Sequence, residues 1–267
     1  MNLLMCPVCH EALKLTEKTW HCANNHSYDV AKQGYVNLHV VQHKHSKNPG
    51  DTVESVQARR AFLSVGFYAP LQKAVVEKIR ELRIENLLDI GCGEGYYTNA
   101  MQAEVLQCVG VDIAKNAVQV AAKLNKKVIW VVGTGATLPV LDASIDLCTS
   151  LFSPIPKQEI LRVLKPHAYL MVVTPAAEHL YAMREALFEE VNPHEPHKFV
   201  DQLADAFELV GESVVEAPFT VQQADLKNLI AMTPYAYKAK PERRQALEQN
   251  EQFELKGQFQ IYLFKKK

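Results

Sequence analysis

The first 26 residues carry three cysteines and a histidine at a spacing that could hold a metal ion. Cys6 and Cys9 are separated by two residues, Cys22 follows after twelve more, and His26 after another three. Thiolates and an imidazole in such a C-x2-C-x12-C-x3-H pattern are typical of structural zinc sites, where four protein ligands leave no open position for catalysis. The sequence therefore predicts a structural zinc ion that holds together a segment too small to fold on its own core.

The identity of the fourth ligand rests on spacing alone. His10 and His21 each adjoin one of these cysteines, but we prefer His26 because three intervening residues bring its ring back to the metal without strain. Three unrelated thiols are the alternative, and the regular pairing argues against it. The chain has six cysteines, and the other three lie in apolar, strand-like segments: Cys92, Cys108 and Cys148. This split argues against a disulfide framework.

A second group of residues, from Asp89 to Thr98, has the glycine spacing of a cofactor-binding turn. The segment reads D-I-G-C-G-E-G-Y-Y-T. Its glycines allow a sharp turn after a strand and a close approach of the backbone to a ligand, and a helix that starts near Gly95 offers free N–H groups. A dinucleotide fingerprint has two residues between its second and third glycines. This segment has one, so it more closely resembles the adenosylmethionine motif of class I methyltransferases.

Two downstream segments support the same interpretation. The second predicted strand ends in Val111-Asp112, and an acid at that place can accept both hydroxyls of a ribose. Residues 133–139 (GTGATLP) follow the third predicted strand, where such enzymes contact adenine. Together these features favour a methyltransferase over a nicotinamide dehydrogenase, and over a glycine turn of purely structural use.

The elements that must position these residues follow from hydrophobic periodicity. From about residue 71, apolar runs alternate with amphipathic patterns, which indicates an α/β sheet. The predicted strands are 86–90, 106–111, 128–132, 145–150, 169–174, 208–216 and 259–264. The predicted helices are 71–83, 95–103, 114–124, 157–164, 178–191 and 222–232. We expect a class I methyltransferase fold, a doubly wound and mostly parallel sheet whose last strand inserts antiparallel, with a small N-terminal zinc-binding module.

Composition and charge divide the 267 residues into three parts. Hydrophobic residues make up 48% and charged residues 22%, which is normal for a globular protein with one large core. We predict a zinc-binding module over 1–37, a basic connector over 38–70 and an adenosylmethionine-dependent methyltransferase domain over 71–267. No apolar run is long enough to cross a bilayer and no signal peptide is recognisable, so we expect a cytoplasmic location.

The net charge of −1 provides no global attraction to nucleic acid or membrane, so any contact with RNA must come from a local basic patch. The connector offers such a patch beside the zinc module. The predicted RNA-binding residues are His43, Lys44, Lys47, Arg59 and Arg60. The alternative is a solvated connector with scattered positive charge.

Over essentially its full length, the sequence resembles the ribosomal large-subunit methyltransferase A family. The motifs that carry the resemblance are Cys6-Pro-x-Cys9, residues 31–38 (AKQGYVNL), 49–51 (PGD), 57–63 (QARRAFL), 68–71 (YAPL) and 89–98 (DIGCGEGYYT). The resemblance implies methylation of N1 of a specific guanine in a hairpin of 23S rRNA, with S-adenosyl-L-methionine as methyl donor. It also implies a homodimer, and the details match the Gram-negative branch of the family better than the tylosin-resistance branch.

The resemblance assigns roles to individual residues. Zinc would be held by Cys6, Cys9, Cys22 and His26. Cofactor-binding residues, taken from the family and the motif together, would be Tyr68, Asp89, Gly91, Gly93, Glu94, Gly95, Tyr97, Thr98, Asp112 and His179. No catalytic base is predicted, and residues 152–156, where related enzymes face the target base, match no family pattern. Two other functions stay open: a methyltransferase acting on a small molecule or protein, and a noncatalytic zinc-dependent RNA-binding protein.

One turn departs from the usual pattern. Many methyltransferases have Lys-Pro-Gly-Gly before the fifth strand, whereas this chain has Lys165-Pro166-His167-Ala168. Because histidine and alanine adopt glycine geometry less freely, we expect a different turn there.

Overall fold

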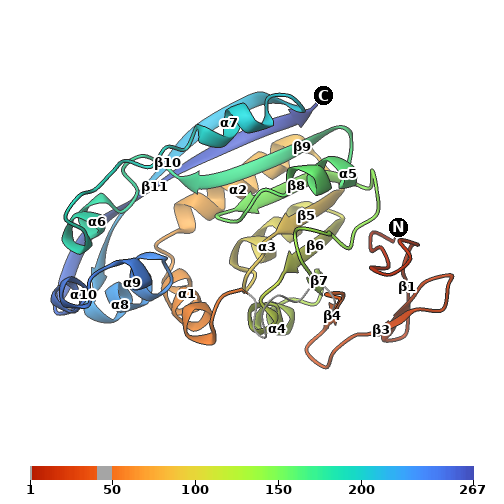
Figure 1. The fold of residues 1–267 in the computed structure, drawn as a ribbon, viewed down its shortest axis with the longest axis horizontal. Helices are drawn as coiled ribbons and strands as arrows, with labels where there is room; N and C mark the ends of the chain where they lie inside the picture. Colours follow the sequence, from red (N-terminus) through yellow and green to blue (C-terminus); the bar gives the residue numbers. More distant parts are fainter. Residues whose placement is uncertain (1, 41–49) are drawn as a thin grey trace.

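The computed structural model describes residues 2–40 and 50–267, and it is organised around a sheet of eight strands (Figure 1). In spatial order the strands are β10 (Phe207–Gln222), β11 (Gln252–Lys266), β9 (Leu164–Pro175), β8 (Ile145–Leu151), β5 (Asn86–Ile90), β6 (Gln107–Asp112), β7 (Ile129–Val132) and β4 (Tyr35–Asn37). Neighbours from β9 through β4 are parallel, while β11 is antiparallel to both β9 and β10. The predicted class I methyltransferase sheet with an antiparallel last strand is therefore confirmed.

Alternate residues of the central strands face opposite sides of the sheet, as the period of two requires. Leu87 belongs to a core with α2 (Ala69–Leu82) and α4 (Lys115–Leu124), whereas Leu88 belongs to a core with α5 (Lys157–Val163). Helices thus cover both faces of the parallel strands, and all five residues of β5 are buried. The glycine turn therefore begins at the end of a strand that lies inside the sheet and is buried on both faces.

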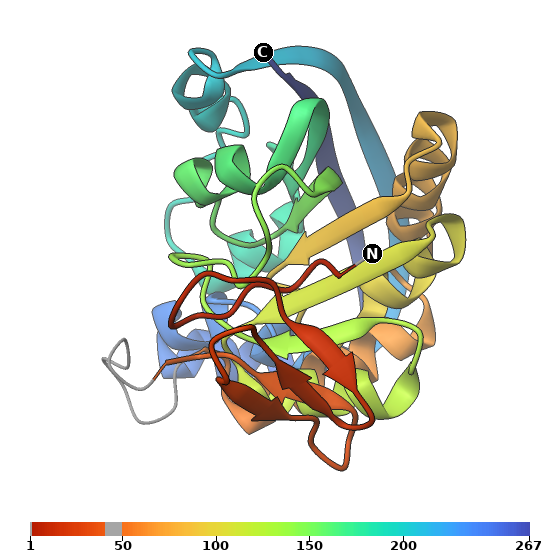
Figure 2. The same ribbon diagram turned by 90° about the vertical axis from the view of Figure 1, so that its right-hand side faces the viewer.

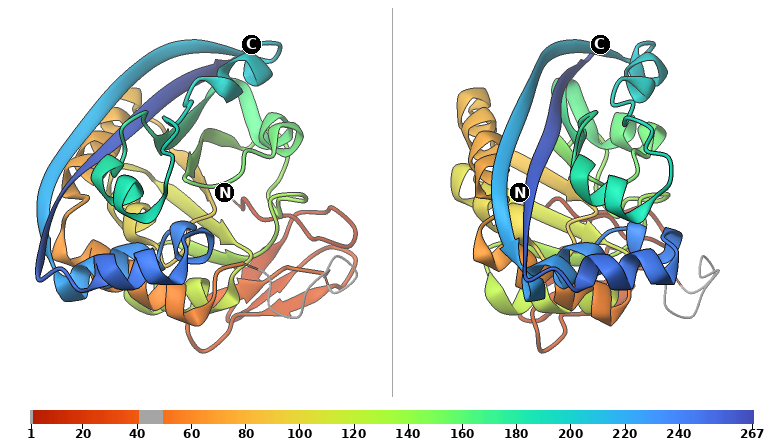
Figure 3. Two further views of the ribbon diagram at one scale, coloured as in Figure 1. Left: turned by 60° about the vertical axis from the view of Figure 1, so that its left-hand side comes forward. Right: turned by 90° about the vertical axis from the view of Figure 1, so that its left-hand side faces the viewer.

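Most predicted elements lie within a few residues of the observed ones, but three differ clearly. The predicted helix 178–191 is only α6 (Tyr181–Leu187), because Leu180 has a left-handed backbone (φ 51°) and Phe188 is extended. The strands β10 and β11 are much longer than predicted because they pair with each other from Phe207↔Lys266 to Gln222↔Gln252. Figure 3 shows this long curved pair extending past the rest of the sheet toward the C-terminal helices.

The far end of the β10–β11 pair packs against α8 (Gln223–Ala231), because Ala217, Val221 and Leu255 are buried in the same core as Leu226 of this helix. Short helices follow as α9 (Tyr235–Lys238) and α10 (Pro241–Glu248). The remaining helices are α3 (Tyr96–Met101), which continues into a 3-10 turn at Gln102–Glu104, and α7 (Lys198–Leu203). No helix in the ranges 2–40 and 50–267 is both long and apolar enough to cross a membrane.

The predicted connector contains a helix that the sequence reading missed. Helix α1 (Val53–Val65) starts at Thr52, whose hydroxyl accepts the N–H of Ser55, and ends at Gly66 with φ 96°. It packs beside α8, as the orange and blue helices in Figure 1 show. Tertiary packing against α8, which lies more than 150 residues away in the chain, stabilises this helix.

The N-terminal segment packs directly on the sheet (Figure 2). A small antiparallel sheet is formed by β1 (Lys14–Thr16), β2 (Thr19–His21) and β3 (Ser27–Asp29). β4 then adds a parallel strand to the edge of the main sheet beside β7. The boundaries at residues 37 and 70 remain a prediction, because the segment before residue 37 shares both a strand and a core with the large sheet.

The segment in which a different turn is expected belongs to the irregular start of β9, where the pairing with β8 shifts register. His167 has φ 59° within β9. Histidine tolerates the left-handed region better than most side chains do, so it can occupy this position, and a difference from the Lys-Pro-Gly-Gly turn stays a prediction. The cost of that backbone conformation is about 1 kcal/mol relative to glycine, which a folded sheet can absorb.

Candidate functional site

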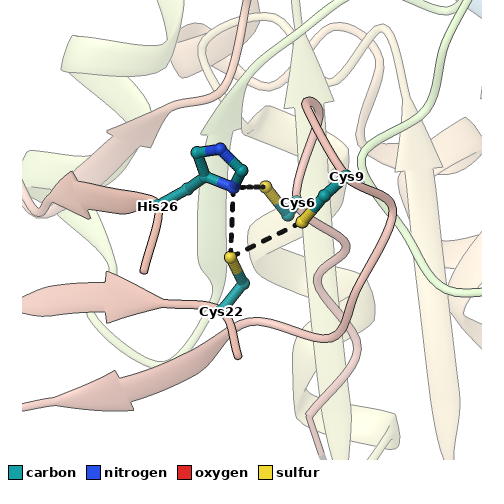
Figure 4. Close-up of side chains that lie close together, drawn as sticks. All are labelled: Cys6, Cys9, Cys22 and His26. Carbon is teal, nitrogen blue, oxygen red and sulfur yellow. Dashed lines mark hydrogen bonds between the residues drawn. The ribbon is translucent and has the colours of Figure 1, made fainter. Parts of the chain in front are cut away.

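The four predicted zinc ligands meet at one point in the N-terminal segment. The side-chain ligand atoms of Cys6, Cys9, Cys22 and His26 all lie within 4.8 Å of one another (Figure 4). The Nδ1 atom of His26 is 3.6 Å from Sγ of Cys6 and 3.3 Å from Sγ of Cys22, and the two sulfurs of Cys9 and Cys22 are 3.6 Å apart. Ligands of a tetrahedral zinc ion are separated by about 3.5–3.8 Å. The arrangement therefore fits one zinc ion, with His26 rather than His10 or His21 in the group.

Two turns bring these ligands together. The backbone N–H of His10 donates to the carbonyl of Cys6, and that of Asn25 donates to the carbonyl of Cys22. His10 and Asn25 both have positive φ, 63° in each case, so each turn closes through a left-handed residue. The hydroxyl of Tyr28 lies 3.2 Å from Sγ of Cys6, where its O–H can stabilise a thiolate.

The N-terminal zinc-binding segment is hydrogen-bonded to the loop of residues 133–141, which also borders the central cleft. The N–H of Met5 donates to the carbonyl of Pro139, and the N–H of Leu141 donates to the carbonyl of Leu3. The guanidinium of Arg162 donates to the carbonyls of Leu138 and Val140 in the same loop. Residues 133–136, at the other end of this loop, line the cleft.

The cleft lies at the carboxyl ends of the parallel strands and has a volume of about 1110 Å³. Ligands of doubly wound sheets bind at this edge. Seven of the ten predicted cofactor residues line it: Tyr68, Gly91, Gly93, Glu94, Tyr97, Asp112 and His179. Residues from helices α1 and α9 close the opposite side, so the cleft is enclosed by segments from both halves of the chain.

Asp112 is held at the end of β6 by two backbone donors. The N–H of Gly93 donates to Oδ2 at 2.9 Å, and the N–H of Ala114 donates to Oδ1 at 2.7 Å. Burial raises the pKa of this carboxyl, while the two N–H groups oppose the rise by stabilising the charged form. Asp112 lines the cleft and each of its oxygens keeps lone-pair capacity, which suits a carboxylate that accepts hydroxyl groups of a ribose.

Three predicted cofactor residues, Asp89, Gly95 and Thr98, do not line the cleft. Asp89 is buried and accepts hydroxyls from Thr98 at 2.5 Å and from Thr149 at 2.7 Å. Burial raises its pKa to about 6 against the effect of these hydrogen bonds. A side chain on Gly95 would approach the ring of Trp130 to 2.7 Å. Asp89 and Thr98 thus brace the glycine turn, and Gly95 permits close packing of its helix.

His179 lies in the cleft as a neutral hydrogen-bond donor. Its Nδ1 accepts the backbone N–H of Gln258 at 3.2 Å, so its single proton is on Nε2. Burial and the neighbouring His194 lower its pKa to about 3. A ring in this state carries an N–H donor at Nε2, which suits a hydrogen bond to a ligand better than the acceptance of a proton.

The predicted RNA-binding residues separate in the structure. His43, Lys44 and Lys47 lie outside the described residues, so their prediction is untested. Arg60 is exposed, whereas Arg59 lines the cleft and its Nη2 lies 2.6 Å from Oδ2 of Asp51. Burial alone would lower the pKa of Arg59, but the carboxylates of Asp51 and Glu94 raise it. Arg59 therefore faces the cofactor turn, against the expectation of a surface contact.

Phe152 is a cleft residue that sequence reasoning did not assign. It follows β8 with φ 57° and is 45% exposed, although its ring lies 5.8 Å from that of Phe259 and 6.3 Å from that of Tyr97. The next residue, Ser153, fixes the loop by donating its hydroxyl to the carbonyl of Ile90 at 2.6 Å. The place of Phe152 directly after a parallel strand could have identified it as a cleft residue from the sequence, because such positions lie at the edge of the sheet where ligands bind.

Comparison with known proteins agrees with this geometry. Residues 4–47 match a family model described as "RlmA, N-terminal", a zinc ribbon, and residues 88–172 match one described as "Methyltransferase domain". The chain is 32% identical over 250 residues to the 23S rRNA (guanine(748)-N(1))-methyltransferase of Streptomyces fradiae, covering 91% of this chain and 88% of the relative. The chain belongs to the ribosomal large-subunit methyltransferase A family.

A second relative, a putative 23S rRNA (guanine-N(1)-)-methyltransferase of Bacillus subtilis, is 27% identical over 260 residues. The match covers 91% of this chain and 89% of the relative. The fold is shared with a chain of the complex between the Haloferax volcanii Trm112 methyltransferase activator and a putative methyltransferase. That match has a TM-score of 0.53 at 15% identity and covers 81% of this chain and 98% of the other. The enzyme thus combines a zinc ribbon with an S-adenosylmethionine-dependent methyltransferase domain, and its assignment to the Gram-negative branch stays a prediction.

Proposed function

We propose that this protein methylates N1 of a guanine in 23S rRNA, using S-adenosyl-L-methionine. The proposal rests on one combination: four residues that could ligate zinc and a cleft beside the glycine turn occur in the same chain. That chain aligns with an rRNA methyltransferase over nine-tenths of its length. Cys6, Cys9, Cys22 and His26 would hold the zinc. The seven predicted cofactor residues that line the cleft would hold the cofactor. A cytoplasmic location and a homodimer belong to the same proposal.

The chemistry divides between cofactor and chain. S-adenosylmethionine, when bound, supplies an electrophilic methyl group. The residues of the cleft then need chiefly to align a guanine with it, because an in-line transfer gains most from proximity and orientation. Guanine N1 carries a proton that must leave, and neutral His179 with its proton on Nε2 is suited to donate a hydrogen bond instead of accepting that proton.

The target guanine needs a surface outside the base stack, and Phe152 is the best candidate in the cleft. A base that is unstacked for chemistry is commonly held against an aromatic side chain. The ring of Phe152 is half-exposed and lies on a loop that the hydrogen bond of Ser153 holds in place. Its backbone is left-handed, and such strained conformations cluster at functional sites. We propose that this ring stacks on the guanine.

Phe152→Ala is expected to lower kcat/KM for rRNA by about 10- to 100-fold, because stacking of one base on an aromatic ring contributes about 1–3 kcal/mol. Phe152→Tyr should retain most activity because it keeps the ring. The binding of S-adenosylhomocysteine, measured by calorimetry, should change little in either variant. An equal loss of cofactor binding and of activity in Phe152→Ala would contradict a role in holding the base.

The function itself is tested by mapping reverse-transcription stops on 23S rRNA from a strain that lacks the enzyme. Incubation with the protein and S-adenosylmethionine should create one new strong stop at a guanine, because N1-methylguanine cannot form a Watson–Crick pair. The absence of both a stop and radiolabelled methyl incorporation into this RNA would refute the proposal and favour a small-molecule or protein substrate. If the protein also failed to bind S-adenosylmethionine at millimolar concentration, a noncatalytic RNA-binding role would be favoured.

A further inference from the structure

Arg59 lies in the cofactor cleft and not on the outer surface where a contact with RNA was predicted. The residue projects from α1 into the cleft, with only 27% of its side chain exposed. A Cβ atom built on Gly93 would lie 3.8 Å from its Nη1 atom, so the guanidinium lies over the glycine turn. The N–H of the same Gly93 donates to Asp112. Arg59 and Asp112 therefore flank one glycine of the cofactor turn.

The charges around Arg59 are unusual for a phosphate contact. The carboxylates of Asp51, Glu94 and Asp112 all act on its guanidinium electrostatically. In the described part of the chain Arg59 makes one ion pair, with Asp51, although a guanidinium offers five N–H donors. Because one cation interacts with three carboxylates, the net charge of this group is negative and disfavours the polyanionic backbone of RNA. The same group of charges suits a ligand that carries one carboxylate and also a positive charge.

We infer that Arg59 binds the α-carboxylate of the amino-acid portion of S-adenosylmethionine, while Asp51 and Glu94 attract its ammonium group. The inference rests on the proposed function, because it presupposes this cofactor. A ligand whose ribose meets Asp112 has its amino-acid end within reach of Arg59, since both side chains border Gly93. Arginine matches a carboxylate with two parallel N–H donors, which fixes orientation as well as affinity. Arg59 is thus a positioning residue for the cofactor.

The inference is tested with two ligands that differ in the group concerned. S-adenosylhomocysteine carries the amino-acid portion, whereas 5′-methylthioadenosine has the same adenosine and lacks it. In calorimetry, Arg59→Gln should bind S-adenosylhomocysteine about 10- to 100-fold more weakly than the unmodified protein, the range expected for a charged hydrogen-bonded contact. Its affinity for 5′-methylthioadenosine should stay within about twofold. The affinity of Arg59→Lys for S-adenosylhomocysteine should lie between those of the unmodified protein and Arg59→Gln, because lysine keeps the charge and loses the paired donors.

Arg60→Gln is the matched control, because it removes the neighbouring exposed arginine of the same helix and should alter neither affinity. Equal losses for both ligands in Arg59→Gln would overturn the inference and indicate a role in folding the cleft. Unchanged binding of both ligands with a weaker affinity for rRNA would overturn it in favour of a phosphate contact. If the unmodified protein bound neither ligand, the proposed cofactor itself would be wrong, which is a separate result.

Discussion

Asp112→Asn is expected to weaken the binding of S-adenosylmethionine by about 10- to 100-fold and to lower methylation in proportion. The side chain keeps its shape, but its amide NH2 group must face the N–H of either Gly93 or Ala114, both of which now donate to a carboxylate oxygen. One oxygen is lost as an acceptor for the ribose, and the negative charge disappears. Calorimetry with S-adenosylmethionine and S-adenosylhomocysteine measures the effect directly.

Asp146→Asn provides a matched control for this substitution. Asp146 also accepts backbone N–H groups, from Glu85 and Asn86, but it lies at the start of β8 and does not line the cleft. The control should lower the free energy of unfolding to a similar degree and leave cofactor affinity unchanged. If both variants lost cofactor affinity equally, Asp112 would have only a structural role, and the ribose assignment would be wrong.

His26→Ala is expected to release zinc and to destabilise the N-terminal segment. Removal of one of four ligands should weaken zinc affinity by on the order of 100-fold or more, because metal binding and folding of so small a segment are coupled. Elemental analysis of the purified variant gives the zinc content, and hydrogen exchange gives the local stability. Protection should fall first in residues 3–37, where the cluster closes the turns at Cys6 and Cys22.

The loss of zinc should also loosen one wall of the cofactor cleft. Leu3 and Met5 are hydrogen-bonded to the loop at Pro139 and Leu141, whose earlier residues 133–136 line the cleft. We therefore expect faster exchange in residues 133–141 and a severalfold weaker affinity for S-adenosylhomocysteine in His26→Ala. His21→Ala, which changes an exposed histidine outside the cluster, is the control and should retain zinc, protection and affinity. Full zinc occupancy in His26→Ala would refute the ligand assignment.

The sequence by itself determined the parts of this protein that depend on short-range spacing. The zinc ligands were predictable because each pair, Cys6 with Cys9 and Cys22 with His26, lies within one tight turn, and the two pairs together have the spacing of a structural zinc site. The strand Asn86–Ile90 and the turn after it were predictable for the same reason, since a short apolar run followed by three closely spaced glycines is typical of a strand that ends in a sharp turn. These local features also carried the cofactor class.

Only the tertiary structure decided which side chains face the cleft. Arg59 and Arg60 are neighbours in sequence, yet α1 packs against α8 so that one enters the cofactor cleft and the other stays exposed. Asp89 belongs to the cofactor motif, but its strand directs it away from the cleft toward Thr98 and Thr149. The rotation of a helix and the face of a strand are set by contacts between segments far apart in the chain, and residue spacing within one segment carries no record of those contacts.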